Sequence, residues 1–222
     1  MLLFSYLQHY LTRFLKKKRT YIYTDAPDYI ESLDFDYIET YSFQRGEEYE
    51  QNLAHIRKEY EILKRRKEKG KRLTTDEKER LNKLHELLGY TQYLLNKRGQ
   101  FHPSSKKINV FTNGDPIIDK IKQILRTEIR ETPKWLCAPE YRDSMVFYDK
   151  SGKIISVLNV CLSCEYMATD MFHQIKGDRK TYYLLKKFFI EIGHEVEDPE
   201  HFVLEEMERV KESMNKKNTK RL

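Results

Sequence analysis

Apolar residues recur at helical spacing over two neighbouring stretches of the chain. They stand at alternating intervals of four and three between residues 49 and 63, and similar spacing returns between residues 81 and 95. Because a stripe of this period lies along one face of an α-helix, the pattern predicts two amphipathic helices that form an antiparallel hairpin. Thr74, followed three residues later by Glu77, is typical of a capping box, and Gly99 stands where a C-terminal cap is expected.

The first 19 residues carry a third apolar stripe. Leu3, Leu7 and Phe14 fall on one helical face, and four cations follow at 16–19, where the end of a helix favours positive charge. We expect an N-terminal amphipathic helix packed on the core, although a helix lying on an anionic membrane surface has the same pattern. Since no run approaches the roughly 20 apolar residues that a membrane span needs, no transmembrane segment is expected.

Residues 20–46 are acidic and rich in tyrosine, and no single hydrophobic period holds across them. An irregular segment packed beside the helices is the simplest interpretation. Exposed tyrosines give large and rigid contact area, so the segment is also a candidate partner-binding surface. Its candidate contact residues are Tyr29, Tyr37 and Tyr41.

The second half of the chain alternates short apolar runs with helical patterns. Asp115 is an N-cap candidate followed by proline at the first helical position, and Gly152 lies in a short loop between two apolar runs, as in a β-hairpin. The predicted elements are a strand at 108–112, a helix from 116, strands at 144–149 and 153–162, and helices at 179–192 and 199–214.

These elements predict an α+β protein in which an N-terminal amphipathic helix and a long antiparallel helical hairpin precede a small antiparallel sheet, in β-α-β-β-α-α order. Such a hairpin cannot bury both of its sides, so we expect it to pack on the second half of the chain or on another molecule. The expected regions are a helical region at 1–99, a linker at 100–107, an α+β domain with a cysteine-bearing β-hairpin at 108–214 and a basic tail at 215–222.

Composition and charge narrow the class of protein. With 39% hydrophobic and 34% charged residues, the 222-residue chain has too few apolar residues for a membrane protein and too many for a disordered one. The net charge of +6 lies within the first 107 residues, where basic and acidic stretches alternate, and self-neutralisation on folding is the simplest interpretation. The stretch at 62–72 is the candidate for nucleic-acid contact, through Lys64, Arg65, Arg66, Lys67, Lys71 and Arg72.

Three cysteines form the main chemical candidate. The register of the predicted β-hairpin sets Cys137 opposite Cys164, and Cys161 shares a C-x-x-C spacing with Cys164, so all three thiols are expected at the open end of the hairpin. Three interpretations stay open: small buried apolar residues, a structural zinc site with His173 as the fourth ligand, or a reactive thiol whose pKa is lowered by Arg142. The strand followed by C-x-x-C locally resembles thioredoxin-like proteins.

No complete phosphate-binding loop, nucleophile elbow or zinc-protease motif occurs in the sequence. The leading hypothesis is therefore an interaction or assembly module without its own catalytic centre, which binds a protein partner or a second copy of itself through the helical hairpin. A cysteine-dependent site, either zinc-binding or redox-active, is the alternative, and nucleic-acid binding through residues 62–72 is the third. No cofactor is expected outside the zinc of that alternative, and an odd number of cysteines without a secretion signal favours the cytoplasm.

Overall fold

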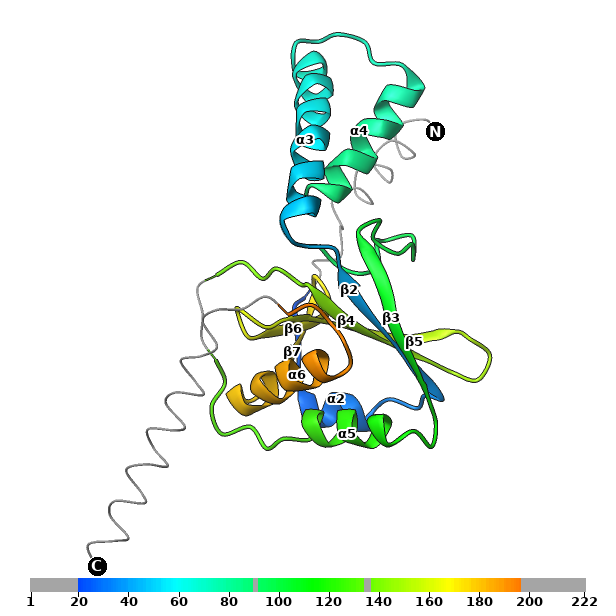
Figure 1. Cartoon of the computed structure of the whole chain (residues 1–222), viewed down its shortest axis with the longest axis vertical. Helices are drawn as coiled ribbons and strands as arrows, with labels where there is room; N and C mark the ends of the chain where they lie inside the picture. The colour runs from blue at the N-terminus through cyan, green and yellow to red at the C-terminus, as the bar shows by residue number, and fades with distance from the viewer. Residues whose placement is uncertain (1–19, 90–91, 134–136, 197–222) are drawn as a thin grey trace, which may run out of the picture.

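The computed structural model of the chain describes residues 20–89, 92–133 and 137–196. Its strands are β1 (Ile22–Asp25), β2 (Tyr37–Phe43), β3 (Ser105–Thr112), β4 (Asp143–Tyr148), β5 (Ile154–Cys161), β6 (Tyr166–Asp170) and β7 (His173–Lys176). Together they form one mixed sheet in the order β1-β7-β6-β5-β4-β2-β3 (Figure 1). β1 runs parallel to β7, and every other neighbouring pair is antiparallel.

The prediction of a small antiparallel sheet is wrong, because the sheet is larger and mixed. Residues 20–46, which we expected to be irregular, contribute β1, α2 (Ala26–Glu31) and β2. β2 lies between β3 and β4 with both faces covered, so it lacks the alternation of a half-exposed strand. β3 begins at Ser105, and residues 166–176 add β6 and β7 to the predicted hairpin.

Three helices cover one face of the sheet: α2, α5 (Pro116–Leu125) and α6 (Arg179–Glu191) (Figure 1). Asp115 and Asp178 cap α5 and α6 by accepting hydrogen bonds from backbone N–H groups of their first turns. The main core lies between these helices and the sheet. Its largest fully buried members are Ile38, Ile121, Leu125, Met145, Phe147, Leu158, Met167, Phe188 and Phe189.

The opposite face of the sheet is covered by the loop at residues 92–104, which we call the covering loop. Leu94 of this loop is buried in a second apolar cluster with Tyr41 and Val146 of the sheet. Its backbone N–H donates to Asn159 Oδ1 on β5 at 2.9 Å. The covering loop is therefore anchored to the sheet by both an apolar side chain and a buried hydrogen bond.

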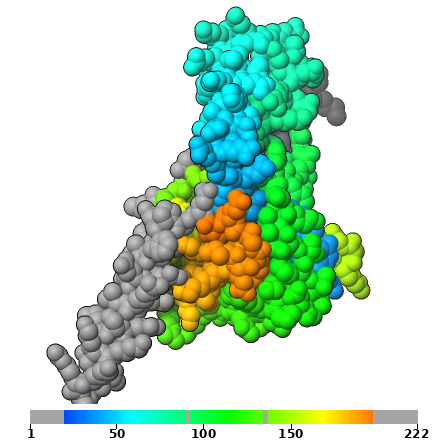
Figure 2. Space-filling model, in the orientation of Figure 1, coloured from blue at the N-terminus to red at the C-terminus, as the bar shows by residue number. Residues whose placement is uncertain are grey.

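α3 (Glu47–Glu68) and α4 (Thr75–Leu87) form the predicted hairpin, called the arm from here on. The capping box is confirmed: Thr74 Oγ1 accepts from the Glu77 N–H, and the Glu77 carboxylate accepts from the Thr74 N–H. α4 ends well before Gly99, which instead closes a turn at a φ of 73°. The arm stands away from the sheet (Figures 1 and 2) and has a small core of its own, made of Leu63, Leu73, Leu81 and Leu84.

Among the described residues, no helix has both the length and the apolar character needed to cross a bilayer. The predicted N-terminal helix, the predicted helix at 199–214 and the basic tail at 215–222 lie outside the described residues.

Candidate thiol–disulfide site

The three cysteines meet at the end of the β4–β5 hairpin, where the predicted register sets Cys137 opposite Cys164. These two cysteines form a disulfide, with their Cα atoms 6.3 Å apart and a sequence separation of 27. Cys137 precedes β4, and Cys164 lies in the turn between β5 and β6. The antiparallel pairing of β4 with β5 sets Asp143 opposite Val160 and brings the segment before β4 close to the turn after β5.

The disulfide is accessible, whereas the third cysteine is buried. Cys137 is exposed and Cys164 is half-buried. Cys161, the last residue of β5, is a free thiol with an exposed fraction of 0%. Cys161, Tyr141 and Ala168 form a packed cluster, and Cys164 packs against it. A buried thiol therefore lies beside an accessible disulfide.

The turn that carries Cys164 is held by its neighbours. Glu165, the next residue, adopts a φ of 50°, which costs a residue with a Cβ atom roughly 1–2 kcal/mol. Its buried carboxylate lies 3.8 Å from Arg179 Nε at the start of α6. Ser163 Oγ lies 3.5 Å from Cys161 Sγ. Packing against α6 thus stabilises a backbone conformation that the turn alone does not favour.

Tyrosine hydroxyls line the buried side of the site. The phenols of Tyr141 and Tyr93 are hydrogen-bonded, and their ring centroids are 5.1 Å apart. Burial raises the pKa of Tyr141 far above its ordinary value, and the neighbouring Tyr93 and Cys161 add to this rise. Burial also raises the pKa of Tyr182, another neighbour of Cys161. Both phenols therefore stay protonated and uncharged beside the thiol.

Two other residues predicted for this site have different partners. The His173 imidazole on β7 pairs with the Thr24 hydroxyl on β1 at 2.8 Å. The Arg142 guanidinium pairs with the Glu140 carboxylate at 3.1 Å. In the part of the chain that the structure describes, no three His, Cys, Asp or Glu side chains gather as a metal-binding group. The structure thus brings the cysteines together without placing His173 in a ligand group.

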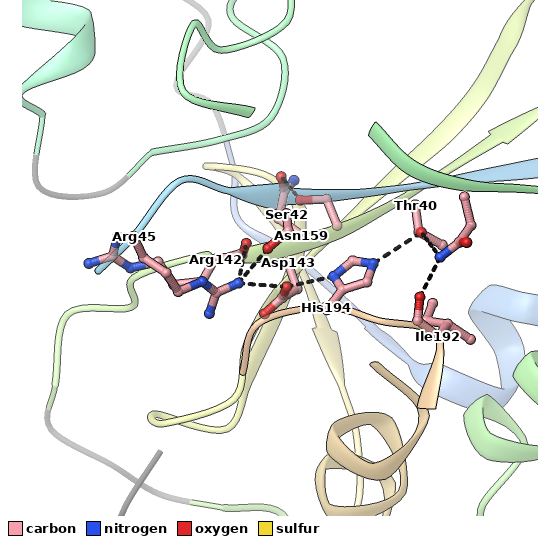
Figure 3. Close-up of polar contacts among 10 residues, drawn as sticks. Thr40, Ser42, Arg45, Arg142, Asp143, Asn159, Ile192 and His194 are labelled. Carbon is pink, nitrogen blue, oxygen red and sulfur yellow. Dashed lines mark hydrogen bonds and ion pairs between the residues drawn. The ribbon is translucent and has the colours of Figure 1, made fainter. Parts of the chain in front are cut away.

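A buried polar chain that sequence reasoning missed lies where the segment after α6 meets the sheet (Figure 3). His194 Nδ1 lies 2.7 Å from Asp143 Oδ1, and Nε2 lies 3.0 Å from Thr40 Oγ1. The order of hydroxyl, imidazole and carboxylate matches a catalytic triad. However, the His194 side chain and Thr40 have exposed fractions of 0%, and Arg45 pairs with the same Asp143 oxygen at 2.9 Å. We therefore interpret these hydrogen bonds as structural contacts that hold the segment after α6 on the sheet.

The three tyrosines predicted as partner contacts lie mostly in the interior. Tyr29 is buried in the main core, and its hydroxyl lies 2.8 Å from the Ser156 hydroxyl. Tyr41 is buried in the second apolar cluster. Tyr37 is half-buried and stacks on Tyr148, with ring centroids 4.6 Å apart. Two of these rings therefore contribute to the core instead of the surface.

Glu39 organises the polar centre of the second apolar cluster. Its carboxylate accepts hydrogen bonds from Lys107 Nζ at 2.6 Å, from the Tyr41 hydroxyl at 2.7 Å and from the Tyr148 hydroxyl at 2.9 Å. Burial by itself raises the pKa of Glu39, but these three hydrogen bonds outweigh it and hold the pKa below its ordinary value. The ionised carboxylate therefore ties β2 to both of its neighbours in the sheet.

The predicted basic stretch lies at the end of the arm that is far from the sheet (Figure 1). Three of its six candidate residues lie beside carboxylates: Arg66 beside Glu77, and Lys64 and Arg65 beside Glu61. The other three are exposed, and no carboxylate among the described residues pairs with them: Lys67, Lys71 and Arg72.

Compared with protein-family models, with curated proteins and with solved structures, the chain matches none of them.

Proposed function

We propose that the protein carries out thiol–disulfide exchange, with Cys137–Cys164 as the reactive disulfide and Cys161 as an internal thiol. The observation that carries the proposal is a buried free thiol packed beside an accessible disulfide. Exchange occurs by direct attack of a thiolate on a disulfide sulfur, and its rate depends on access to that sulfur. The exposure of Cys137 supports attack from outside, and the packing of Cys164 against the cluster that holds Cys161 supports attack from inside.

Exchange with a thiol substrate takes two displacement steps. A substrate thiolate attacks the exposed Cys137 sulfur, forms a mixed disulfide and releases Cys164 as a thiolate. A second substrate thiolate attacks the substrate sulfur of the mixed disulfide and releases Cys137. Two substrate thiols become one substrate disulfide, the protein disulfide is reduced to two thiols, and the two protons pass from the substrate to Cys137 and Cys164.

Cys161 gives Cys164 a second disulfide partner. The Cys161 thiolate attacks the Cys164 sulfur, the bond from Cys164 to Cys137 breaks, and Cys137 leaves as a thiolate that takes up the proton lost by Cys161. The number of disulfides is unchanged. The disulfide moves into the C-x-x-C pair, and the exposed Cys137 becomes a free nucleophile.

A cycling disulfide agrees with the expected cytoplasmic setting. Disulfides in the cytosol are usually transient and either catalytic or redox-sensing, whereas structural disulfides belong to oxidising compartments. We expect a reduction potential between about −180 and −270 mV, the range of exchange-active dithiols. A value below about −300 mV, which is typical of structural disulfides, would contradict the proposal.

The direct test follows disulfide formation in glutathione buffers by intact mass after alkylation of the denatured protein. Cys137→Ser leaves Cys161 and Cys164 as the only cysteines of the chain. The proposal predicts that oxidising buffer joins them, so this variant takes up no alkyl group. Cys161→Ser is the matched control, because it keeps the Cys137–Cys164 pair and should form its disulfide as the wild type does.

Two results would overturn the proposal at different levels. If Cys137→Ser keeps two alkylatable thiols at every glutathione ratio, internal exchange through Cys161 does not occur. If glutathione reduces the wild-type disulfide only after the protein unfolds, the bond is structural and the exchange function as a whole is wrong. Circular dichroism of each variant establishes that it is folded.

A further inference from the structure

We infer that the end of the arm binds the phosphate backbone of duplex nucleic acid. Residues 64–78, called the arm tip, span the end of α3, the connecting loop and the start of α4. The arm tip holds eight Lys and Arg residues against three Asp and Glu residues. Dense positive charge of this kind supplies the sequence-independent part of nucleic-acid binding.

The positive charge of the described residues is concentrated in the arm tip. The described ranges hold 29 basic and 28 acidic residues, so the described residues outside the tip hold 21 basic and 25 acidic ones. The rest of the described part is therefore net negative, and the tip carries an excess of five positive charges. A polyanion is thus attracted to the tip in preference to the rest of the described part.

Part of this charge has no ion-pair partner. Glu77 binds Arg66 and also closes the capping box at Thr74, so this carboxylate is already engaged. The four cations between residues 67 and 72 are exposed, and no ion pair holds them in the part of the chain that the structure describes: Lys67, Lys69, Lys71 and Arg72. Their charge is available to an external anion.

The composition of the arm tip favours a phosphate backbone over other anionic partners. Residues 64–78 contain no aromatic residue, so the tip offers no ring for stacking on unpaired bases. Leu73, its one large apolar residue, is buried in the core of the arm, whereas a membrane-bound segment presents an apolar face beside its cations. A protein interface is usually anchored by buried aromatic or apolar side chains, which this surface also lacks.

The arm gives the tip the reach that a duplex requires. α3 has 22 residues and spans about 33 Å at 1.5 Å per residue. Figure 2 shows the arm standing clear of the bulk of the sheet and its helices. The tip can therefore approach a duplex backbone without a collision between the duplex and the body of the protein.

Fluorescence anisotropy with labelled DNA and RNA duplexes tests this inference. Each phosphate contact contributes about 0.9 to the log–log dependence of affinity on salt, so four contacts predict a slope of about −4. A variant that combines Lys67→Gln, Lys69→Gln, Lys71→Gln and Arg72→Gln should bind at least about tenfold more weakly with a slope near zero. The matched control removes the same charge from exposed loops elsewhere and should bind like the wild type: Lys97→Gln, Arg98→Gln, Lys150→Gln and Lys153→Gln.

The inference is wrong if neither duplex binds at low salt, or if the tip and control variants lose affinity equally. Two further probes separate the competing partners. Binding to vesicles of phosphatidylserine and phosphatidylcholine without duplex binding would overturn the inference and assign the tip to a membrane surface. Binding to polyglutamate without duplex binding would also overturn the inference and would indicate that the arm binds an acidic protein. Preference between the DNA and RNA duplexes identifies the nucleic acid.

Discussion

His102, in the covering loop, is a buried histidine with hydrogen-bond partners on both ring nitrogens. Its Nδ1 accepts a hydrogen bond from the Ser104 N–H at 3.3 Å, and its Nε2 lies 3.1 Å from the Glu86 carbonyl oxygen, to which the neutral ring donates. Burial lowers the pKa of His102, and the Glu86 carbonyl opposes part of that effect. The Ser104 hydroxyl also lies 2.7 Å from Nδ1 and donates to it when the ring is neutral.

We predict that His102 makes the fold sensitive to mild acid. Because the folded pKa lies below the ordinary value of 6.5, the unfolded state binds more protons at intermediate pH. The stabilising contribution is complete above about pH 6.5 and is lost as the pH falls through the folded pKa. Urea unfolding at about pH 7.5 and pH 5.5 should show a larger loss in the wild type than in His102→Gln, which does not titrate. Equal losses would contradict the prediction.

Residue contacts were predictable only where local register decides them. The short loop between β4 and β5 predicts that Cys137 and Cys164 lie near each other, but a β-bulge between Phe147 and Tyr148 shifts the pairing from the register that we expected. The contacts of His194 do not follow from any local pattern. Asp143 lies 51 residues away in sequence and Thr40 lies 154 residues away, so their meeting depends on the complete sheet.

At the level of elements, helices were more predictable than central strands. α3 was predictable from its apolar period, and α5 from its apolar period and its capping residue Asp115, which are local signals. β2 carries polar residues such as Glu39 whose partners come from distant strands, so the sequence alone resembles an irregular segment. The helical spacing that continues to Leu95 was misleading, because Leu94 and Leu95 pack on the sheet as part of the covering loop.

The capping box gives a prediction for the arm. Thr74→Ala removes the hydroxyl that accepts from the Glu77 N–H at 3.2 Å and should destabilise the arm by about 1 kcal/mol. Because the arm has its own core, amides of α4 should exchange hydrogen about fivefold faster, while amides of α5 stay unchanged. Thr75→Ala, one residue further along on the exposed surface, is the control. Similar acceleration in both variants would argue against a role for the cap.

For the molecule as a whole, the segment after Cys137 links the disulfide to the base of the arm. Glu140, Tyr141 and Arg142 line a hollow of about 170 Å³ together with residues of α3 and the end of α4. The Arg142 carbonyl oxygen accepts hydrogen bonds from the Phe43 N–H at 2.8 Å and from Arg45 at 3.3 Å. The segment that lines this hollow beside α3 therefore follows directly on Cys137, whose disulfide we propose to be redox-active.

We predict that reduction of the disulfide loosens this base. Hydrogen exchange in residues 138–142 and in the first turn of α3 should become several-fold faster after reduction, because the segment loses its covalent anchor. Cys137→Ser should reproduce the effect under oxidising conditions. α5, at the end of the molecule away from the arm (Figure 1), serves as the internal reference. Unchanged exchange at the base would show that the arm does not sense the disulfide.

The order of the strands also sets the order in which a growing chain can fold. β1 pairs with β7, where Ile22 faces His173, so the first strand has no partner until most of the described chain has been synthesised. α3 and α4 follow each other closely and bury their own small core. Local contacts form quickly, whereas distant strand pairing is slow. Translation arrested before β7 would leave a product with a closed arm beside an unpaired β1, which is the type of exposed strand that chaperones and proteases encounter.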